Sequence, residues 1–158
     1  MNNKNSPLTS ELDEIKQING TPDELDIICK VFNRNILQLT GFARKKEPNA
    51  VDLQALDDVV KELLNENATF VIDRCKDKIW GAKEYIKTQN ADYFLNRDYS
   101  ELIKQDSNES VIINLVSIIK RGWNTLYPNE KEAIWNKMKL MLKSVAFYEK
   151  WKRATSIE

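Results

Sequence analysis

The 158-residue chain contains no histidine, two cysteines, four glycines and four prolines. Without histidine, it lacks the commonest general base and metal ligand, and every nucleophile pair in which histidine activates serine or cysteine. Two cysteines do not make a zinc site, and no Cys-x-x-Cys motif occurs. There is also no glycine-rich phosphate loop, Gly-x-Ser-x-Gly motif or EF-hand loop. We therefore expect a protein that is not an enzyme and needs no cofactor or metal.

The chain also lacks a net charge, with 24 basic and 24 acidic residues, so no overall field favours nucleic acid or a membrane. The charge is unevenly distributed, because residues 111–158 carry nine basic and four acidic side chains. The longest apolar run, 111–119, is interrupted twice and is about half the length of a bilayer span. The polar start is unlike a secretory signal, so we expect an intracellular protein without a membrane partner.

Hydrophobic residues make up 42% of the chain and recur with helical spacing. No segment alternates with period two for long enough to predict a strand. The sequence predicts an all-α fold, an irregular bundle of five to seven helices. We expect residues 1–8 to be a disordered tail, residues 9–153 to form a single helical domain and residues 154–158 to be frayed. Cys29 and Cys75 fall on apolar stripes and are predicted to be buried thiols.

The first half of the chain carries the best local signals for helix boundaries. A short helix is predicted over Thr9–Ile18. Thr21, Pro22 and Glu24 form a capping box with proline in the first turn, which predicts the start of a second helix. Gly41 is placed where a helix commonly ends.

The middle of the chain has fewer such signals. Residues 44–48 are predicted to be a solvated loop. Residues 50–88 form one bent helix or two, and the polar residues 65–67 favour two. Short helical turns are expected over 89–107. The helix predicted over 108–123 has an apolar arc broad enough to be buried on more than one side.

The final helix, predicted over Asn129–Arg153, is apolar on two sides. A second apolar arc, formed by Leu140, Phe147 and Trp151, lies more than a quarter turn from the main stripe. Such a helix is either central in the bundle or carries a second apolar face for a partner. The main stripe comprises Ile134, Met138, Met141, Val145 and Tyr148.

Phe70 and Trp80 also point away from the stripe of their own helix. A bundle of this size needs some central helices, so core packing and an exposed patch both explain these residues. Leu140, Phe147 and Trp151 are the candidate residues for binding a protein partner or a second copy of the chain. We expect Leu140 in the interior and Trp151, near the chain end, to be exposed or at an interface.

A nucleic-acid partner is the alternative hypothesis. Basic residues follow the polar side of the final helix and continue past it, and Trp151 is available to stack on a base. This strip contains little arginine for reading base edges, and no known DNA-binding motif accompanies it. The basic residues are Lys139, Lys143, Lys150, Lys152 and Arg153.

From Phe94 onward the chain carries short segments with a recognisable spacing. They are Phe94-Leu95, 98–102 (DYSEL), 123–135 (WNTLYPNEKEAIW) and 138–142 (MKLML). In these segments the chain resembles small all-helical proteins of unknown role from large nucleocytoplasmic DNA viruses. The resemblance implies a virus-encoded accessory or structural protein in the cytoplasm or associated with the virus. It carries over no functional residues.

Overall fold

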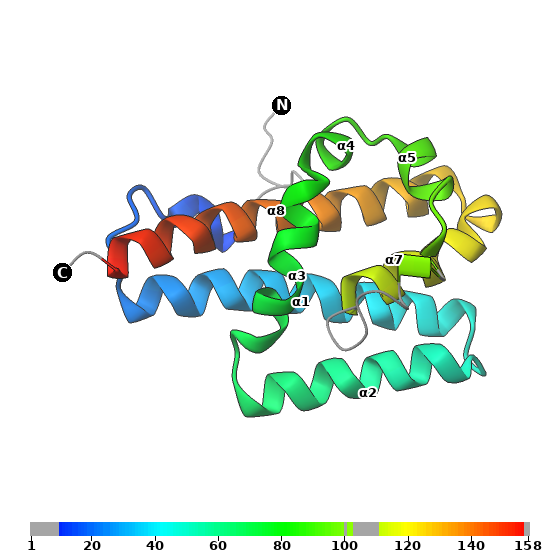
Figure 1. Ribbon diagram of the computed structural model, residues 1–158, viewed down its shortest axis with the longest axis horizontal. Helices are drawn as coiled ribbons and strands as arrows, with labels where there is room; N and C mark the ends of the chain where they lie inside the picture. The colour runs from blue at the N-terminus through cyan, green and yellow to red at the C-terminus, as the bar shows by residue number, and fades with distance from the viewer. Residues whose placement is uncertain (1–9, 100, 103–110, 157–158) are drawn as a thin grey trace.

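The computed structural model describes residues 10–99, 101–102 and 111–156. These residues form seven α-helices and two short 3₁₀ helices, and contain no strand (Figure 1). This confirms the predicted all-α bundle. None of the helices in the described ranges is long and apolar enough to cross a membrane. The predicted tail, residues 1–8, lies outside the described residues.

The long helices are α1 and α8, which pack against each other along much of their length in opposite directions (Figure 1). α2 runs back beside α1, and α3 crosses the bundle steeply to connect α2 with the elements above α8. The elements are η1 (Glu11–Glu14), α1 (Pro22–Lys46), α2 (Val51–Glu66), α3 (Phe70–Gly81), α4 (Lys83–Lys87), α5 (Ala91–Leu95), α7 (Val111–Gly122), η3 (Trp123–Thr125) and α8 (Pro128–Thr155).

The start of α1 is the predicted capping box. The Thr21 hydroxyl accepts the backbone N–H of Glu24 at 3.2 Å. In return, the Glu24 carboxylate accepts the N–H groups of Thr21, Gly20 and Asn19. These hydrogen bonds, that from the Thr21 N–H above all, lower the pKa of Glu24 because they stabilise its ionised carboxylate. Gly20 has φ +86°, and a Cβ there would approach Thr155 Cγ2 to 3.0 Å, so this turn favours glycine.

The predicted end of this helix at Gly41 is wrong. α1 continues to Lys46, and the predicted loop over 44–48 begins only after that residue. Gly41 is exposed with open space around it, so the helix passes through it without strain. Residues of α2 stabilise the last turn of α1. Arg44 donates to the carboxylate of buried Asp57 at 2.8 Å and to Gln54 Oε1 at 2.7 Å. These tertiary bonds outweigh the local stop signal.

Residues 50–88 form two main helices, α2 and α3, as favoured, followed by the short α4. The first break is stabilised by the Asn67 side chain, which accepts the backbone N–H of Thr69 at 2.9 Å. The second falls at Ala82, which is buried between α3 and α4.

The predicted short helix over Thr9–Ile18 is also wrong in the residues that the structure describes. Only the 3₁₀ turn η1 forms, and Ile15 already has an extended backbone. The chain then continues without regular structure to Thr21. Residue 9 itself lies outside the described part.

The helix predicted over 108–123 begins, in the described residues, at Val111, and α7 contacts α1, α2, α3 and α5 as its broad apolar arc predicts. The final helix exceeds its predicted bounds, because α8 continues through Ala154 to Thr155. Thus the expected fraying from residue 154 is not seen in those two residues.

α1 and α8 provide much of the core. Trp135 and Leu142 are buried on α8 although they lie outside both predicted arcs. Cys29 and Cys75 are buried and unbonded, as predicted. Burial raises the pKa of Cys29 to about 11 and that of Cys75 to about 12, so both thiols stay protonated at neutral pH. The largest fully buried side chains include Phe32, Leu12, Ile28, Ile36, Leu39, Leu53, Ile72, Leu115 and Met141.

Candidate functional site

The second apolar face of α8 is in contact with the chain's own N-terminal segment, residues 10–21. Leu140 is buried, as expected, whereas Phe147 and Trp151 are partly buried. Phe147 shares the lining of a hollow with residues 15–18. Trp151 Nε1 donates to the carbonyl of Thr21 at 2.7 Å. The face therefore has an intramolecular cover, and its role in binding a partner stays a prediction.

The N-terminal segment contacts both α1 and α8. Leu12 is completely buried. The Glu11 carboxylate accepts two hydrogen bonds from the Arg34 guanidinium, each 2.8 Å long. The hydrogen bond from Arg34 is the main reason that the pKa of Glu11 falls to about 2. Lys143 of α8 forms an ion pair with Asp13, which lowers the pKa of that carboxyl.

The five basic residues of the nucleic-acid hypothesis have different neighbours along α8. Lys139 donates to Gln89 Oε1 at 2.6 Å, and Lys143 pairs with Asp13. Both also line a groove beside Trp80. Toward the end of α8, the Lys150 amine lies 5.8 Å from the ring centre of Phe147, the Lys152 amine lies 5.4 Å from that of Tyr148, and Arg153 is exposed. Their binding to nucleic acid stays a prediction.

Of the two other off-stripe aromatics, Phe70 is partly buried beneath the Arg74 guanidinium, 5.4 Å from its ring centre. Trp80 is different, because 44% of it is exposed.

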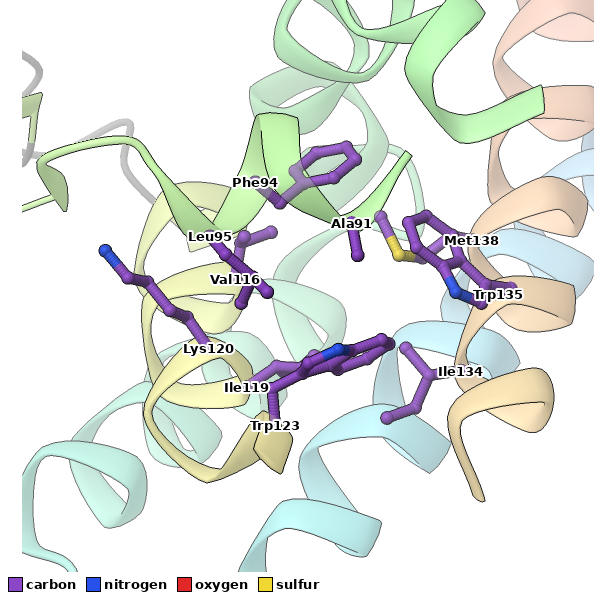
Figure 2. Close-up of a pocket in the computed structure, with 10 residues that line it drawn as sticks. All are labelled: Ala91, Phe94, Leu95, Val116, Ile119, Lys120, Trp123, Ile134, Trp135 and Met138. Atoms are coloured by element: carbon purple, nitrogen blue, oxygen red, sulfur yellow. The ribbon is translucent and has the colours of Figure 1, made fainter. Parts of the chain in front are cut away.

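An apolar pocket opens at the other end of α8, where α5, α7, η3 and α8 meet (Figure 2). We call it the aromatic pocket. It contains about 370 Å³ of space between its walls, including the mouth. Figure 2 shows the methyl group of Ala91 pointing into this space, with Phe94 above it and Trp123 below. The lining residues are Ala91, Phe94, Leu95, Val116, Ile119, Lys120, Trp123, Ile134, Trp135 and Met138.

A series of five aromatic rings runs from α4 to η3, and it links α5 to α8 beside the pocket. Tyr85 stacks on Tyr93 with ring centres 3.7 Å apart, and Tyr93 meets Phe94 edge-on at 5.0 Å. Phe94 then contacts Trp135 at 5.8 Å, and Trp135 contacts Trp123 at 5.9 Å. Each contact has a favourable offset or tilted geometry, apart from the close parallel stack. These ring contacts attach the five-residue helix α5 to its neighbours, since none of its own side chains is fully buried.

Of the described lining residues, only Lys120 has a charged side chain, and its amine already has partners. It donates to the carbonyl of Arg97 at 2.8 Å and lies 5.3 Å from the ring centre of Tyr99. The pocket thus offers apolar contact, without a paired acid and base on its walls. No group of three potential metal ligands converges among the described residues.

Sequence reasoning missed this pocket. It treated Trp123 as part of a helix stripe and did not place Trp135 or Phe94 in any site. The available signal was the spacing in the segments that carry the viral resemblance, because Phe94, Leu95 and Trp123 come from them, as do Ile134, Trp135 and Met138.

Comparison of the chain with protein-family models, with curated proteins and with solved structures finds no match. The resemblance to viral proteins therefore stays a hypothesis.

Proposed function

We propose that the protein is a non-enzymatic binding protein that acts by contact with another protein, whose apolar side chain occupies the aromatic pocket. The observation that supports this most directly is a pocket that opens to solvent and is lined by apolar side chains, with one engaged lysine. Binding energy at protein interfaces is concentrated where a large side chain enters a well-packed pocket of this kind.

The size and position of the pocket suit one anchoring side chain of a partner. Its 370 Å³ includes the open mouth, and the enclosed part is small, so the anchor inserts only the tip of its apolar side chain and lies mostly in the mouth. Tyr127, at the start of α8, is 68% exposed and adds aromatic surface at this end of the bundle. The Lys131 amine, 5.3 Å from the ring centre of Trp123, supplies positive charge beside it. We therefore expect a partner segment with an apolar anchor and acidic neighbours.

A peptide-display selection on the full chain tests this proposal. Selected peptides should share an aromatic residue or leucine, flanked by acidic residues. Ala91→Phe places a ring in the space that the anchor needs, so it should weaken the selected peptides at least tenfold, by roughly the burial energy of one large side chain. Ala55→Phe, at an exposed position on α2, is the matched control and should leave affinity unchanged.

Two results would count against the pocket. One is a set of selected peptides that bind Ala91→Phe as tightly as the native protein. The other is a selection that yields peptides without a common apolar residue. If the partner is a second copy of the chain, sedimentation equilibrium should show a dimer that Ala91→Phe dissociates and Ala55→Phe does not.

A virus-encoded accessory role and an intracellular location are further parts of this proposal. The first depends on the resemblance in the segments after Phe94, and the second on the composition of the chain.

A further inference from the structure

A second concave surface lies between α4 and α8, distinct from the aromatic pocket. Trp80 forms one wall at the end of α3, and Leu142 and Ala146 of α8 form an apolar floor. Lys87, Lys139 and Lys143 complete the described lining, and none of its six residues carries a carboxylate. We call this surface the Trp80 groove.

Positive charge in the Trp80 groove is only partly neutralised. Lys143 pairs with Asp13, and the Lys87 amine lies 3.9 Å from the carboxylate of Glu84. The amine of Lys139 contacts the neutral side chain of Gln89. Lys83 places its amine 4.0 Å from the ring centre of Trp80, and within the described ranges it has no acidic partner. The three lining amines and that of Lys83, which lies over the Trp80 ring, thus meet two carboxylates, and the groove has an excess of positive charge.

The lysines are arranged in two short rows with an exposed aromatic ring beside them. Lys83 and Lys87 are four residues apart on α4, and Lys139 and Lys143 are four apart on α8, so the backbone advances about 6 Å within each pair. This spacing is comparable with that of successive phosphates on an extended strand. Trp80 is 44% exposed and already attracts one cation to its ring. Exposed aromatic rings in positively charged grooves are the usual platforms for unpaired bases.

We propose that the Trp80 groove binds single-stranded nucleic acid without sequence preference. A base stacks on Trp80 in place of the Lys83 amine, and the lysines of both walls contact phosphates. The described residues of the lining include no arginine, and therefore lack the bidentate contacts that read base edges. A nucleic-acid strand also suits the lysine-rich lining better than an acidic protein does, because lysine is depleted from the centres of protein interfaces.

Fluorescence anisotropy with labelled ten-nucleotide oligo(dT) and the full chain tests this assignment. At 50 mM salt the oligonucleotide should bind, and Trp80→Ala should weaken binding roughly tenfold, the range for losing one stacked base. Trp80→Phe keeps a ring and should retain most of the affinity. The double variant Lys87→Gln/Lys139→Gln should reduce the slope of log affinity against log salt by about 1.4, since each phosphate contact to a single strand contributes about 0.7.

The matched control is Lys150→Gln/Lys152→Gln, which removes the same charge from α8 outside the groove and should leave the slope unchanged. All five side chains are at least partly exposed, so the variants should keep the native circular dichroism spectrum. Ala91→Phe should not affect oligonucleotide binding, so this proposal and that of the aromatic pocket fail separately.

Several outcomes would overturn the proposal. No binding at 50 mM salt would do so, as would equal affinity for a duplex, whose bases are not available for stacking. A loss of affinity in the Lys150/Lys152 control equal to that in the groove variant would move binding to the end of α8. Full displacement by poly-glutamate, together with no effect of Trp80→Ala, would assign the groove to an acidic protein instead.

Discussion

The two ends of α8 carry apolar surface that the bundle treats in opposite ways. Toward its C-terminal end, Phe147 and Trp151 are partly covered by the N-terminal segment, residues 10–21, through an ion pair and a hydrogen bond. Toward its N-terminal end, Trp123 and Trp135 line a pocket that remains open. The N-terminal segment, which covers the first end, presents its own polar groups to solvent. At the other end, α5 covers the aromatic pocket only in part. An apolar arc on a helix therefore shows that a cover is needed, but does not show whether the chain supplies it.

The largest expected effect comes from removing the anchor of the covered end. Leu12 is completely buried, so Leu12→Ala should lower the free energy of unfolding by about 3 kcal/mol. Leu95, a partly exposed leucine of the open pocket, is the matched control, and Leu95→Ala should cost about 1 kcal/mol. Urea denaturation measures both. Equal losses would mean that the two ends are packed alike.

In Leu12→Ala, the thiols of Cys29 and Cys75 should also be labelled at different rates. Cys29 lies on α1 near Tyr148, in the half of the bundle that the N-terminal segment covers, and Cys75 lies on α3 in contact with α7. In the native protein both should react slowly with a thiol reagent. Leu12→Ala should speed the labelling of Cys29 several-fold by favouring local opening, and leave Cys75 unchanged. Equal acceleration of both would indicate global unfolding instead.

A smaller effect is expected from the hydrogen bond that ties Trp151 to the segment. Trp151→Phe keeps an aromatic ring beside Tyr148 but removes the bond to the Thr21 carbonyl, so stability should fall by about 1 kcal/mol. Trp80→Phe makes the same change at an exposed tryptophan and should have almost no effect on stability. Thermal denaturation of the pair tests whether Trp151 contributes through its indole nitrogen.

The smallest effect concerns the ion pair at the start of the segment. Glu11 and Arg34 are each about a third exposed, so Glu11→Gln should cost about 1 kcal/mol or less at pH 7. Folding lowers the pKa of Glu11 from 4.5 to about 2, so its ionised form stabilises the fold. This contribution is complete above about pH 4.5 and is lost as the pH falls toward 2.

Unfolding measured from pH 7 to below pH 2 should therefore show the difference between Glu11→Gln and the native protein shrink as the pH falls and vanish below pH 2. Glu14→Gln, in the same 3₁₀ turn but without an ion pair in the described structure, is the control. A difference that stays constant with pH would show that the glutamine disturbs packing rather than charge.

The sequence predicted what depends on neighbouring residues. The start of α1 follows from Thr21, Pro22 and Glu24, because Thr21 and Glu24 are close enough in the chain to form the capping box themselves. The burial of Cys29 and Cys75 follows from helical period alone. In each case the physical cause acts over a few residues, so the pattern is visible in one segment.

Features that depend on distant residues were missed or placed wrongly. The end of α1 is set by Arg44 meeting Asp57, and the local signal at Gly41 points elsewhere. Residues 15–18 have an apolar pattern that suits a helix, yet they run without one beside Phe147. The aromatic pocket needs rings from three separate parts of the chain, and no single-segment pattern predicts their meeting.

The pairing of α1 with α8 also has a consequence for how the protein is made. Among the described elements these helices are each other's most extensive neighbours, yet the ribosome synthesises α1 well before α8. The apolar side of α1, including Ile28, Phe32 and Ile36, must wait for about eighty intervening residues before its main cover exists. At 5–20 residues per second, this delay lasts roughly 4–16 s. During this interval the apolar side of α1 lacks its main cover in the growing chain, and the two helices pair only once α8 has left the ribosome.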